Sequence, residues 1–185
     1  MIKQFVTRKH KFDAGHRVMH ERFKCHNLHG HEYHVELTFS YEVPKSLGYA
    51  IDFKEIKRIG CTWIDEYLDH GMICNPKDEK LIALCQELGS KFYVMRLTDD
   101  KGFCNPSAEN IAKELFFIIS VLLNQTDETK LTLEKLTLHE TVNCYVDCVG
   151  IEQEDWDRLV KSDLWRNLIS FKTKLGELEY DDRLL

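Results

Sequence analysis

The sequence predicts an α+β fold in which helices pack on one face of an antiparallel β-sheet. Two stretches near the N-terminus alternate apolar and polar residues, as strands with one buried face do. Other stretches repeat apolar residues at intervals of three and four, which is the spacing of an amphipathic helix. Strands and helices do not alternate regularly along the chain, so we expect no parallel βαβ arrangement.

The composition sets the broad class of protein. The chain of 185 residues has the length of one domain, and its hydrophobic content of 43% is ordinary for a globular protein. A net charge of −6 argues against a nucleic-acid binder. No apolar run approaches the roughly 20 residues of a membrane span, and the N-terminus lacks the apolar core of a secretion signal. Seven cysteines then indicate reduced, mostly buried thiols in a cytoplasmic protein.

Two strands followed by a helix are expected in the N-terminal part of the chain. The first strand covers about residues 2–14, and the second runs from about 31 to 43. Proline and glycine within residues 44–48 mark the turn after the second strand. Asp52 is the expected N-cap of the helix, because a glutamate follows three residues later as in a capping box. This helix should end near residues 68–71.

The rest of the chain predicts three helices and two strands. A short helix at about 81–88 and a strand at about 92–97 have weak patterns. Ser107, directly after a proline, is typical of a helix start, and apolar residues then recur at helical spacing. A strand over roughly 133–146 and a last helix between 152 and 171 complete the expected order.

The stretch just before the second strand is the most informative for function. Cys25 is followed there by His29-Gly30-His31. Apolar residues from Tyr33 onward fall on one face of the strand, and His29 and His31 extend the same row. Two imidazoles on one face can bind a single ion, and the glycine between them permits close approach of the backbone. The pattern therefore predicts a metal centre with a thiol beside it.

A third metal ligand must come from elsewhere in the chain. Catalytic zinc commonly has three protein ligands and one open position. His16 is the best candidate, because it lies at the end of the strand expected to pair with the second. An isolated histidine there would more often be a polar cap of the strand; the nearby pair of histidines favours a ligand.

Cys25 either ligates the metal or stands beside it as a base. A four-residue step through a loop separates it from His29 and allows both arrangements. Only a few per cent of a free thiol is ionised at pH 7, so a base at this position needs a cation or an imidazole nearby.

Glu140 is the most informative carboxylate. It shares the parity of the apolar residues in the strand at 133–146, so it interrupts a buried face. A buried carboxylate normally has a partner, since an unpaired charge is costly to bury. That partner is either a ligand with an amino-amide fork, which matches two carboxylate oxygens, or an arginine of this chain.

Two further pairs of polar residues are less specific. Asp69 and His70 suit a carboxylate that orients an imidazole, although helix ends often carry histidine. Ser107 and Glu109 are explained as the N-cap and first-turn acid of a helix.

Five short motifs follow one another along the chain. They are Phe12-Asp13-Ala14-Gly15-His16-Arg17, Cys25-xxx-His29-Gly30-His31, Leu68-Asp69-His70 with Asn75, Pro106-Ser107-Ala108-Glu109-Asn110, and His139-Glu140-Thr141. In order and spacing they resemble the 6-pyruvoyltetrahydropterin synthase / 6-carboxytetrahydropterin synthase family. The resemblance excludes the segment around residues 78–101 and the tail beyond about 146.

The resemblance implies the tunnelling fold of that family. Residues 1–185 would form one pterin-synthase-like domain, whose sheet joins those of other subunits into a barrel. A homo-oligomer, a hexamer, is implied, and exposed sheet edges need such covering. The segment at about 76–105 would be an elaboration, and residues from about 147 to 185 a C-terminal helical extension.

The same resemblance implies a role for each candidate residue. Zn²⁺ would be bound by three histidines, His16, His29 and His31. Cys25 would abstract a proton, and His70, with Asp69 beside it, would relay one. Glu140 would anchor the pterin ring and join the relay, and the substrate would also meet Ser107 and Glu109.

The implied substrate is 7,8-dihydroneopterin triphosphate. The implied products are 6-carboxy-5,6,7,8-tetrahydropterin, acetaldehyde and triphosphate. This reaction is a step in the synthesis of queuosine and related deazapurines. The three-residue gap between Cys25 and His29 is typical of the bacterial carboxy type. The alternatives are a pyruvoyl enzyme that only eliminates triphosphate, a non-catalytic zinc or pterin binder, and a structural zinc site closed by Cys25. A basic cluster near the thiol is formed by Arg17, Arg22 and Lys24. This cluster either binds the triphosphate or is a solvated basic patch.

Overall fold

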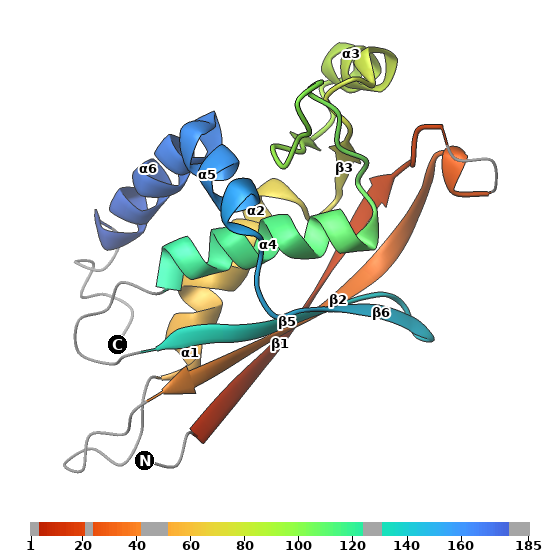
Figure 1. The fold of residues 1–185 in the computed structure, drawn as a ribbon. Coiled ribbons are helices and arrows are strands. Elements are labelled where there is room, and N and C mark those ends of the chain that lie inside the picture. Colours follow the sequence, from red (N-terminus) through yellow and green to blue (C-terminus); the bar gives the residue numbers. More distant parts are fainter. Residues whose placement is uncertain (1–3, 21–23, 42–51, 124–130, 178–185) are drawn as a thin grey trace.

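The computed structural model describes residues 4–20, 24–41, 52–123 and 131–177. Within these ranges a six-stranded sheet has the strand order β4-β3-β1-β2-β5-β6, with most helices on one face (Figure 1). The strands are β1 (Gln4–His16), β2 (His29–Tyr41), β3 (Gly71–Cys74), β4 (Phe92–Val94), β5 (Thr132–Thr141) and β6 (Cys144–Cys148). The helices are α1 (Phe53–Ile56), α2 (Thr62–Tyr67), α3 (Glu79–Leu88), α4 (Ala108–Leu123), α5 (Gln153–Lys161) and α6 (Asp163–Glu177). A 3₁₀ turn, η1 (Lys24–His26), and a π-helical segment, η2 (Lys57–Cys61), complete the order.

Strands β1 and β2 form the long antiparallel pair that the alternating pattern predicts. Their register runs from Gln4 opposite Tyr41 to His16 opposite His29. The apolar row of β2 is fully buried beneath the helices, as at Val35, while the alternate residues face away. The α+β class is thus confirmed. The start of the first predicted strand, the end of the second and the turn expected at 44–48 lie outside the described residues.

The sheet is mixed, so the expectation of a purely antiparallel sheet was wrong. Strand β3 runs parallel to β1, with Ala14 opposite Gly71, and β4 runs parallel to β3. Helix α3 connects β3 to β4, which makes one βαβ unit. These strands have four and three residues, too few for a period-two pattern to be visible in the sequence. The helix predicted at 81–88 and the strand begun at 92 are both present.

Two predicted elements are each divided in the structure. The strand expected over 133–146 is a hairpin, because the chain turns between β5 and β6 at Val142, which is 93% exposed. The helix expected between 152 and 171 is broken at Ser162 into α5 and α6. The Ser162 hydroxyl accepts a hydrogen bond from the Leu164 N–H at 3.2 Å and so caps the second helix.

Helix α4 is the centre of the core. It lies between the sheet and the α5–α6 pair, and its Phe117 ring meets the Trp156 ring edge-on at 4.7 Å between centroids (Figure 1). Its buried Glu114 carboxylate accepts hydrogen bonds from the Tyr93 hydroxyl and from the Arg96 and Leu97 N–H groups. Burial raises the pKa of Glu114, and these donors compensate part of that cost. The carboxylate thereby ties the middle segment to the core.

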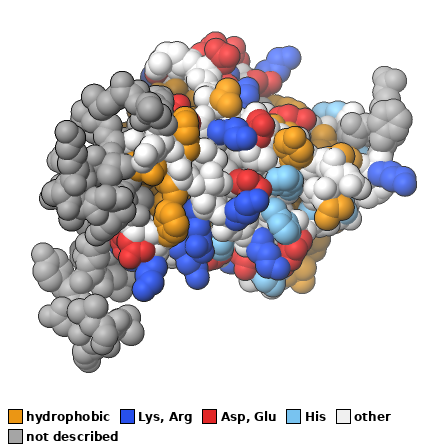
Figure 2. Space-filling model, turned by 90° about the horizontal axis from the view of Figure 1, so that it is seen from below, with side chains coloured by type: hydrophobic (Ala, Val, Ile, Leu, Met, Phe, Trp, Pro, Cys, Tyr) orange, Lys and Arg blue, Asp and Glu red, His pale blue; other side chains and the backbone are white. Residues whose placement is uncertain are grey.

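The opposite face of the sheet is largely uncovered and carries charged and histidine side chains (Figure 2). Ion pairs cross between strands there: Lys9 to Glu36 and Lys11 to Glu32, each at 2.8 Å. Helix α3 is the exception to one-sided packing, because it covers Cys74 of β3 rather than the main core. No helix in the described ranges is long and apolar enough to cross a membrane.

Replacing Leu136 by alanine should lower the free energy of unfolding by about 2–5 kcal/mol, because the side chain is fully buried opposite Leu37 and would leave a cavity. Urea denaturation followed by circular dichroism measures this loss. Leu88→Ala is the matched control, since Leu88 is 68% exposed and should lose far less. Equal losses for the two variants would contradict the assignment of the core.

Candidate metal centre and active site

Three imidazoles converge where β1 ends and β2 begins. The antiparallel register places His16 directly opposite His29, and His31 follows two residues later on the same face. Their ligand nitrogens all lie within 4.8 Å of one another. The three histidines predicted as metal ligands are therefore brought together, and His16 is a member of this group rather than an isolated strand cap.

Hydrogen bonds fix which nitrogen of two of these rings is free to bind. The His16 Nδ1–H donates to the Pro106 carbonyl at 2.6 Å, and the His29 Nδ1–H donates to the Asn27 carbonyl at 2.8 Å. Each bond leaves the Nε2 lone pair available, as backbone carbonyls do for metal-bound histidines. Burial lowers the pKa of His16, which favours the neutral, ligating form.

The spacing of the nitrogens fits a cation. The Nε2 atoms of His16 and His29 are 3.2 Å apart. Two such lone pairs repel each other, whereas two nitrogens bound about 2.05 Å from one tetrahedral ion are about 3.3 Å apart. The Nε2 of His31 is buried and has no hydrogen-bond partner among the described residues. A metal ion would satisfy all three nitrogens, and three imidazoles suit zinc and similar transition metals.

Two glycines allow the strands to come close at this point. Gly15 and Gly30 are opposite each other in the β1–β2 register. A Cβ atom at Gly30 would lie 3.1 Å from the Ala14 carbonyl oxygen, and one at Gly15 would lie 2.5 Å from the Met72 sulfur. The close approach expected at Gly30 is thus confirmed, and a side chain at either position would disturb the ligands.

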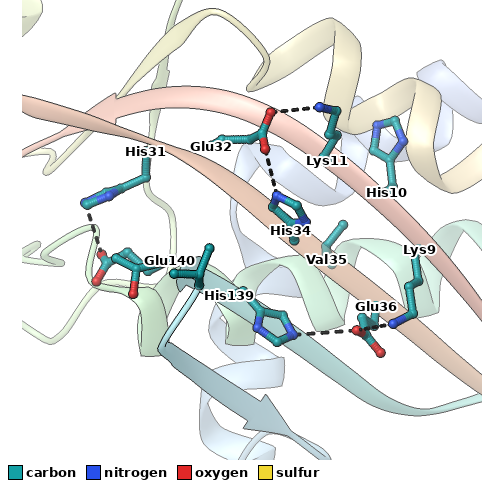
Figure 3. A pocket seen from close by; sticks show the side chains of 12 residues that line it. Lys9, His10, Lys11, His31, Glu32, His34, Val35, Glu36, His139 and Glu140 are labelled. Carbon is teal, nitrogen blue, oxygen red and sulfur yellow. Dashed lines mark hydrogen bonds and ion pairs between the residues drawn. The ribbon is translucent and has the colours of Figure 1, made fainter.

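Glu140 lies beside the imidazoles. Its Oε1 atom is 3.5 Å from the Nε2 of His16. The same atom is 4.0 Å from the Nε2 of His31 (Figure 3). The parity of Glu140 predicted that it interrupts a buried face of its strand, and this prediction is correct. Among the described residues its neighbours at ion-pair distance are these imidazoles and not an arginine. Its side chain keeps 27% exposure, which leaves the carboxylate accessible to a ligand.

Cys25 lies in η1 and is exposed. Its carbonyl accepts a hydrogen bond from the Val18 N–H at 2.8 Å, which closes the loop between β1 and β2. Within the described residues, the group of converging ligand atoms contains the histidines but not this thiol. A site closed by Cys25 as fourth ligand is therefore not formed here. Five other cysteines are buried and free, as expected from the sequence.

Asp69 and His70 form a second cluster with Asp13. The Asp69 carboxylate accepts hydrogen bonds from the Asp13 N–H at 2.8 Å and from the His70 Nδ1–H at 2.7 Å. Burial opposes ionisation of Asp69, but these two bonds outweigh it and hold its pKa below the usual value. The expected carboxylate-oriented imidazole is present, and His70 is 76% exposed.

This second cluster is not joined to the metal centre within one chain. Asp13 and His16 are three residues apart on β1, so their side chains leave the strand on opposite faces. The two clusters therefore share no side chain and leave β1 on opposite faces, although His31 and His70 both line one hollow of about 580 Å³. His70 also adopts a left-handed backbone conformation, φ 56°, which a hydrogen bond from its N–H to the Asp13 carbonyl holds in place.

Of the remaining candidates, Ser107 and Arg17 have structural partners. The Ser107 carbonyl accepts from the Ile111 N–H at 2.9 Å at the start of α4, and Glu109 is exposed in the first turn. Arg17 makes a two-point ion pair with Asp78, at 2.5 and 2.6 Å, and this pairing raises the pKa of Arg17. Lys24 is exposed, and Arg22 lies outside the described residues.

Asp78 and Asn105 were missed by sequence reasoning. Asn105 makes two hydrogen bonds with the Met19 backbone, at 2.9 and 3.0 Å, and so holds the loop that leads to Cys25. Asp78 holds the start of the same loop through Arg17. The partners are 61 and 86 residues away in sequence, and no local pattern signals them.

A hollow of about 650 Å³ extends from the metal centre along the uncovered face of β1, β2 and β5 (Figure 3). His31 and Glu140 line one end. Toward the other end Glu36 lies between Lys9, at 2.8 Å, and His139, at 3.6 Å. The charges along this hollow are therefore largely paired with one another.

The fold and the three imidazoles define a family of pterin enzymes. A family model described as 6-pyruvoyl tetrahydropterin synthase matches residues 5–150, and the chain belongs to this family. A protein of Rickettsia conorii named 6-carboxy-5,6,7,8-tetrahydropterin synthase is 39% identical over 150 residues, which covers 80% of this chain and 99% of the relative. A protein of Rickettsia felis with the same name is 38% identical over 154 residues, with the same coverage.

Solved structures share the fold at lower identity. An uncharacterized protein from Wolinella succinogenes aligns with a TM-score of 0.67 and 19% identity, covering 82% of this chain and all of that chain. The 6-pyruvoyl tetrahydropterin synthase of Caenorhabditis elegans aligns with a TM-score of 0.57 and 20% identity, covering 82% and 98%. The expected pterin-synthase fold is thereby confirmed.

Replacing His31 by alanine should remove most of the bound metal, because it deletes one of three ligands. Mass spectrometric metal analysis after dialysis measures the content per chain. His34→Ala is the control: it is exposed on the opposite face of the same strand and pairs with Glu32. Metal retained by the His31 variant at the level of the control would contradict the assignment.

Proposed function

We propose that this protein is a zinc-dependent, cytoplasmic 6-carboxy-5,6,7,8-tetrahydropterin synthase acting in queuosine or deazapurine synthesis. It would convert 7,8-dihydroneopterin triphosphate to 6-carboxytetrahydropterin, acetaldehyde and triphosphate. The convergence of three Nε2 atoms, one of them buried without a partner in the described chain, is the observation that carries the proposal. The names of the Rickettsia relatives support the carboxy product.

His16, His29 and His31 would hold Zn²⁺, with the fourth position left to the substrate. When bound, the ion acts as a Lewis acid and makes a substrate hydroxyl or carbonyl group more acidic. The chain contributes the orientation of the ligands, through the Pro106 and Asn27 carbonyls, and a partly enclosed site next to Glu140.

Cys25 would remove a proton from a carbon of the substrate side chain, and His70 would return one. The exposure of the Cys25 thiol and its place outside the ligand group support a base rather than a ligand. The hydrogen bond to Asp69 leaves the Nε2 atom of His70 to exchange the proton. After these transfers triphosphate leaves. One water then adds to the side-chain carbonyl next to the ring, and cleavage of the adjoining carbon–carbon bond leaves the carboxyl group on the ring and releases acetaldehyde.

Glu140 would anchor the pterin, because a carboxylate accepts two parallel N–H bonds from an amino-amide fork. Its partial exposure beside the imidazoles supports this role. Ser107 and Glu109, at the start of α4, would contact the same ligand. The hydrogen bond from His16 to the Pro106 carbonyl, one residue before Ser107, supports a place for this helix start near the imidazoles.

The complete site would require a second copy of the chain. The separation of His70 from the imidazoles on opposite faces of β1 supports a subunit that supplies its own His70 to a neighbour. Strand β6 is a short sheet edge with Tyr145 60% exposed, which suits pairing with another sheet. We propose a homohexamer in which the sheets join into a barrel.

Product analysis tests the reaction. Purified protein loaded with Zn²⁺ and given dihydroneopterin triphosphate should release acetaldehyde and a carboxypterin, both identified by mass spectrometry. Release of triphosphate without acetaldehyde would indicate a 6-pyruvoyl enzyme instead. Bound zinc with no turnover would favour a non-catalytic zinc or pterin binder and would contradict the proposal.

Cys25→Ala should abolish turnover, with a loss of at least 10²- to 10⁴-fold for removal of the base, while the zinc content stays at the wild-type level. Steady-state kinetics and metal analysis on the same preparation measure both. Cys144→Ala is the control, because Cys144 is also exposed and free but lies at the β6 edge. Full activity of the Cys25 variant would exclude it as the base.

A further inference from the structure

Tyr33 is the next residue after His31 on the same face of β2, and it is fully buried. Its ring stacks on Phe12 at 5.1 Å between centroids. The rings of His31 and His16 lie edge-on to it, at 5.6 and 6.0 Å. The tyrosine ring therefore forms the floor of the metal centre and packs as the apolar row requires.

The hydroxyl of Tyr33 is not explained by packing. It is buried and has no hydrogen-bond partner anywhere in the described ranges. Buried polar groups are nearly always paired, because an unsatisfied one costs stability. The other buried tyrosine, Tyr93, follows this rule and donates to Glu114 at 2.5 Å. A phenylalanine would fill the position of Tyr33 without that cost.

The surroundings of the hydroxyl belong to the candidate active site. The His16 and His31 rings contact the Tyr33 ring, and the Glu140 Oε1 atom lies 3.5 and 4.0 Å from the Nε2 atoms of these two histidines. The hydroxyl is thus a donor without a partner in the described chain, on a ring that packs against the groups that would surround a ligand.

We infer that the Tyr33 hydroxyl donates a hydrogen bond to an oxygen of the ligand that binds between the imidazoles and Glu140. Without ligand the hydroxyl stays unsatisfied, because the site is arranged to place a ligand oxygen next to it. The identity of the ligand rests on the proposed function, under which the oxygen belongs to the side-chain diol of a dihydropterin. Tyr33 would then help to select an oxygenated side chain in the correct orientation.

Tyr33→Phe distinguishes this role from a structural one, because it should maintain or raise thermostability while it lowers ligand affinity. Without ligand, the variant should be at least as thermostable as the wild type, since only an unsatisfied hydroxyl is lost. With zinc loaded, its affinity for 7,8-dihydroneopterin should fall about 10- to 100-fold, the usual loss for one buried hydrogen bond. Differential scanning fluorimetry and isothermal titration calorimetry measure the two quantities.

Tyr93→Phe is the matched control. It removes a hydroxyl that does have a partner, so it should lower the melting temperature and leave the pterin affinity unchanged. A Tyr33 variant that behaves like this control would show that the hydroxyl has a structural partner and would overturn the inference.

A second ligand keeps the inference separate from the proposed function. Acetohydroxamate binds divalent metals through oxygen, and its binding to the cobalt-substituted protein can be followed by visible absorption. If the wild type binds acetohydroxamate but not the pterin, the proposed function fails, and a weaker acetohydroxamate complex of Tyr33→Phe still supports the hydroxyl as a donor. Unchanged affinity of Tyr33→Phe for the ligands that the wild type binds would overturn the inference.

Discussion

The pairing register of β1 and β2 is the constraint on which the candidate site depends. It places His16 opposite His29 and Gly15 opposite Gly30, so three imidazoles meet where two backbones can approach closely. A slip of β1 by one residue would turn His16 to the other face of the sheet, away from His29 and His31. The buried apolar side chains of the paired strands resist such a slip, because the same shift would expose those of the shifted strand to water. The hydrophobic core thereby maintains the geometry of a polar site.

The segment between β3 and α4 holds the other side of the site in position. The Pro106 carbonyl orients His16, Asn105 holds the Met19 backbone, and Asp78 holds Arg17. These three contacts link the middle of the chain to His16, a candidate metal ligand, and to the Cys25 loop. Glu114 in turn fixes this segment to α4, so the loop is connected to the most buried helix of the protein. Asp78 and Asn105, which lie outside the family motifs, therefore support the end of β1 and the loop that leads to Cys25.

The two faces of the sheet divide the polar groups. The covered face ends in the imidazoles and Glu140, whereas Asp69 and His70 lie with Asp13 on the other face. On that face the lysines of β1 are paired with glutamates of β2, so its charge is largely neutralised. Such a face can lie against another subunit at a lower electrostatic cost than unpaired charges would impose. This division is the physical basis for the proposed oligomer.

The sequence alone determined which side chains could form the metal centre, because face alternation within one strand is a local property. This alternation predicted the positions of His29 and His31 and the parity of Glu140. The class of fold followed from the strand and helix patterns together, and the start of α4 followed from the serine after a proline. Only the tertiary structure decided the short parallel strands β3 and β4, the breaks at Val142 and Ser162, and the face on which His70 lies. It also decided that Tyr33, which the sequence assigned to the core, has a hydroxyl without a partner in the described chain. These features depend on contacts between residues far apart in sequence, and no local period records them.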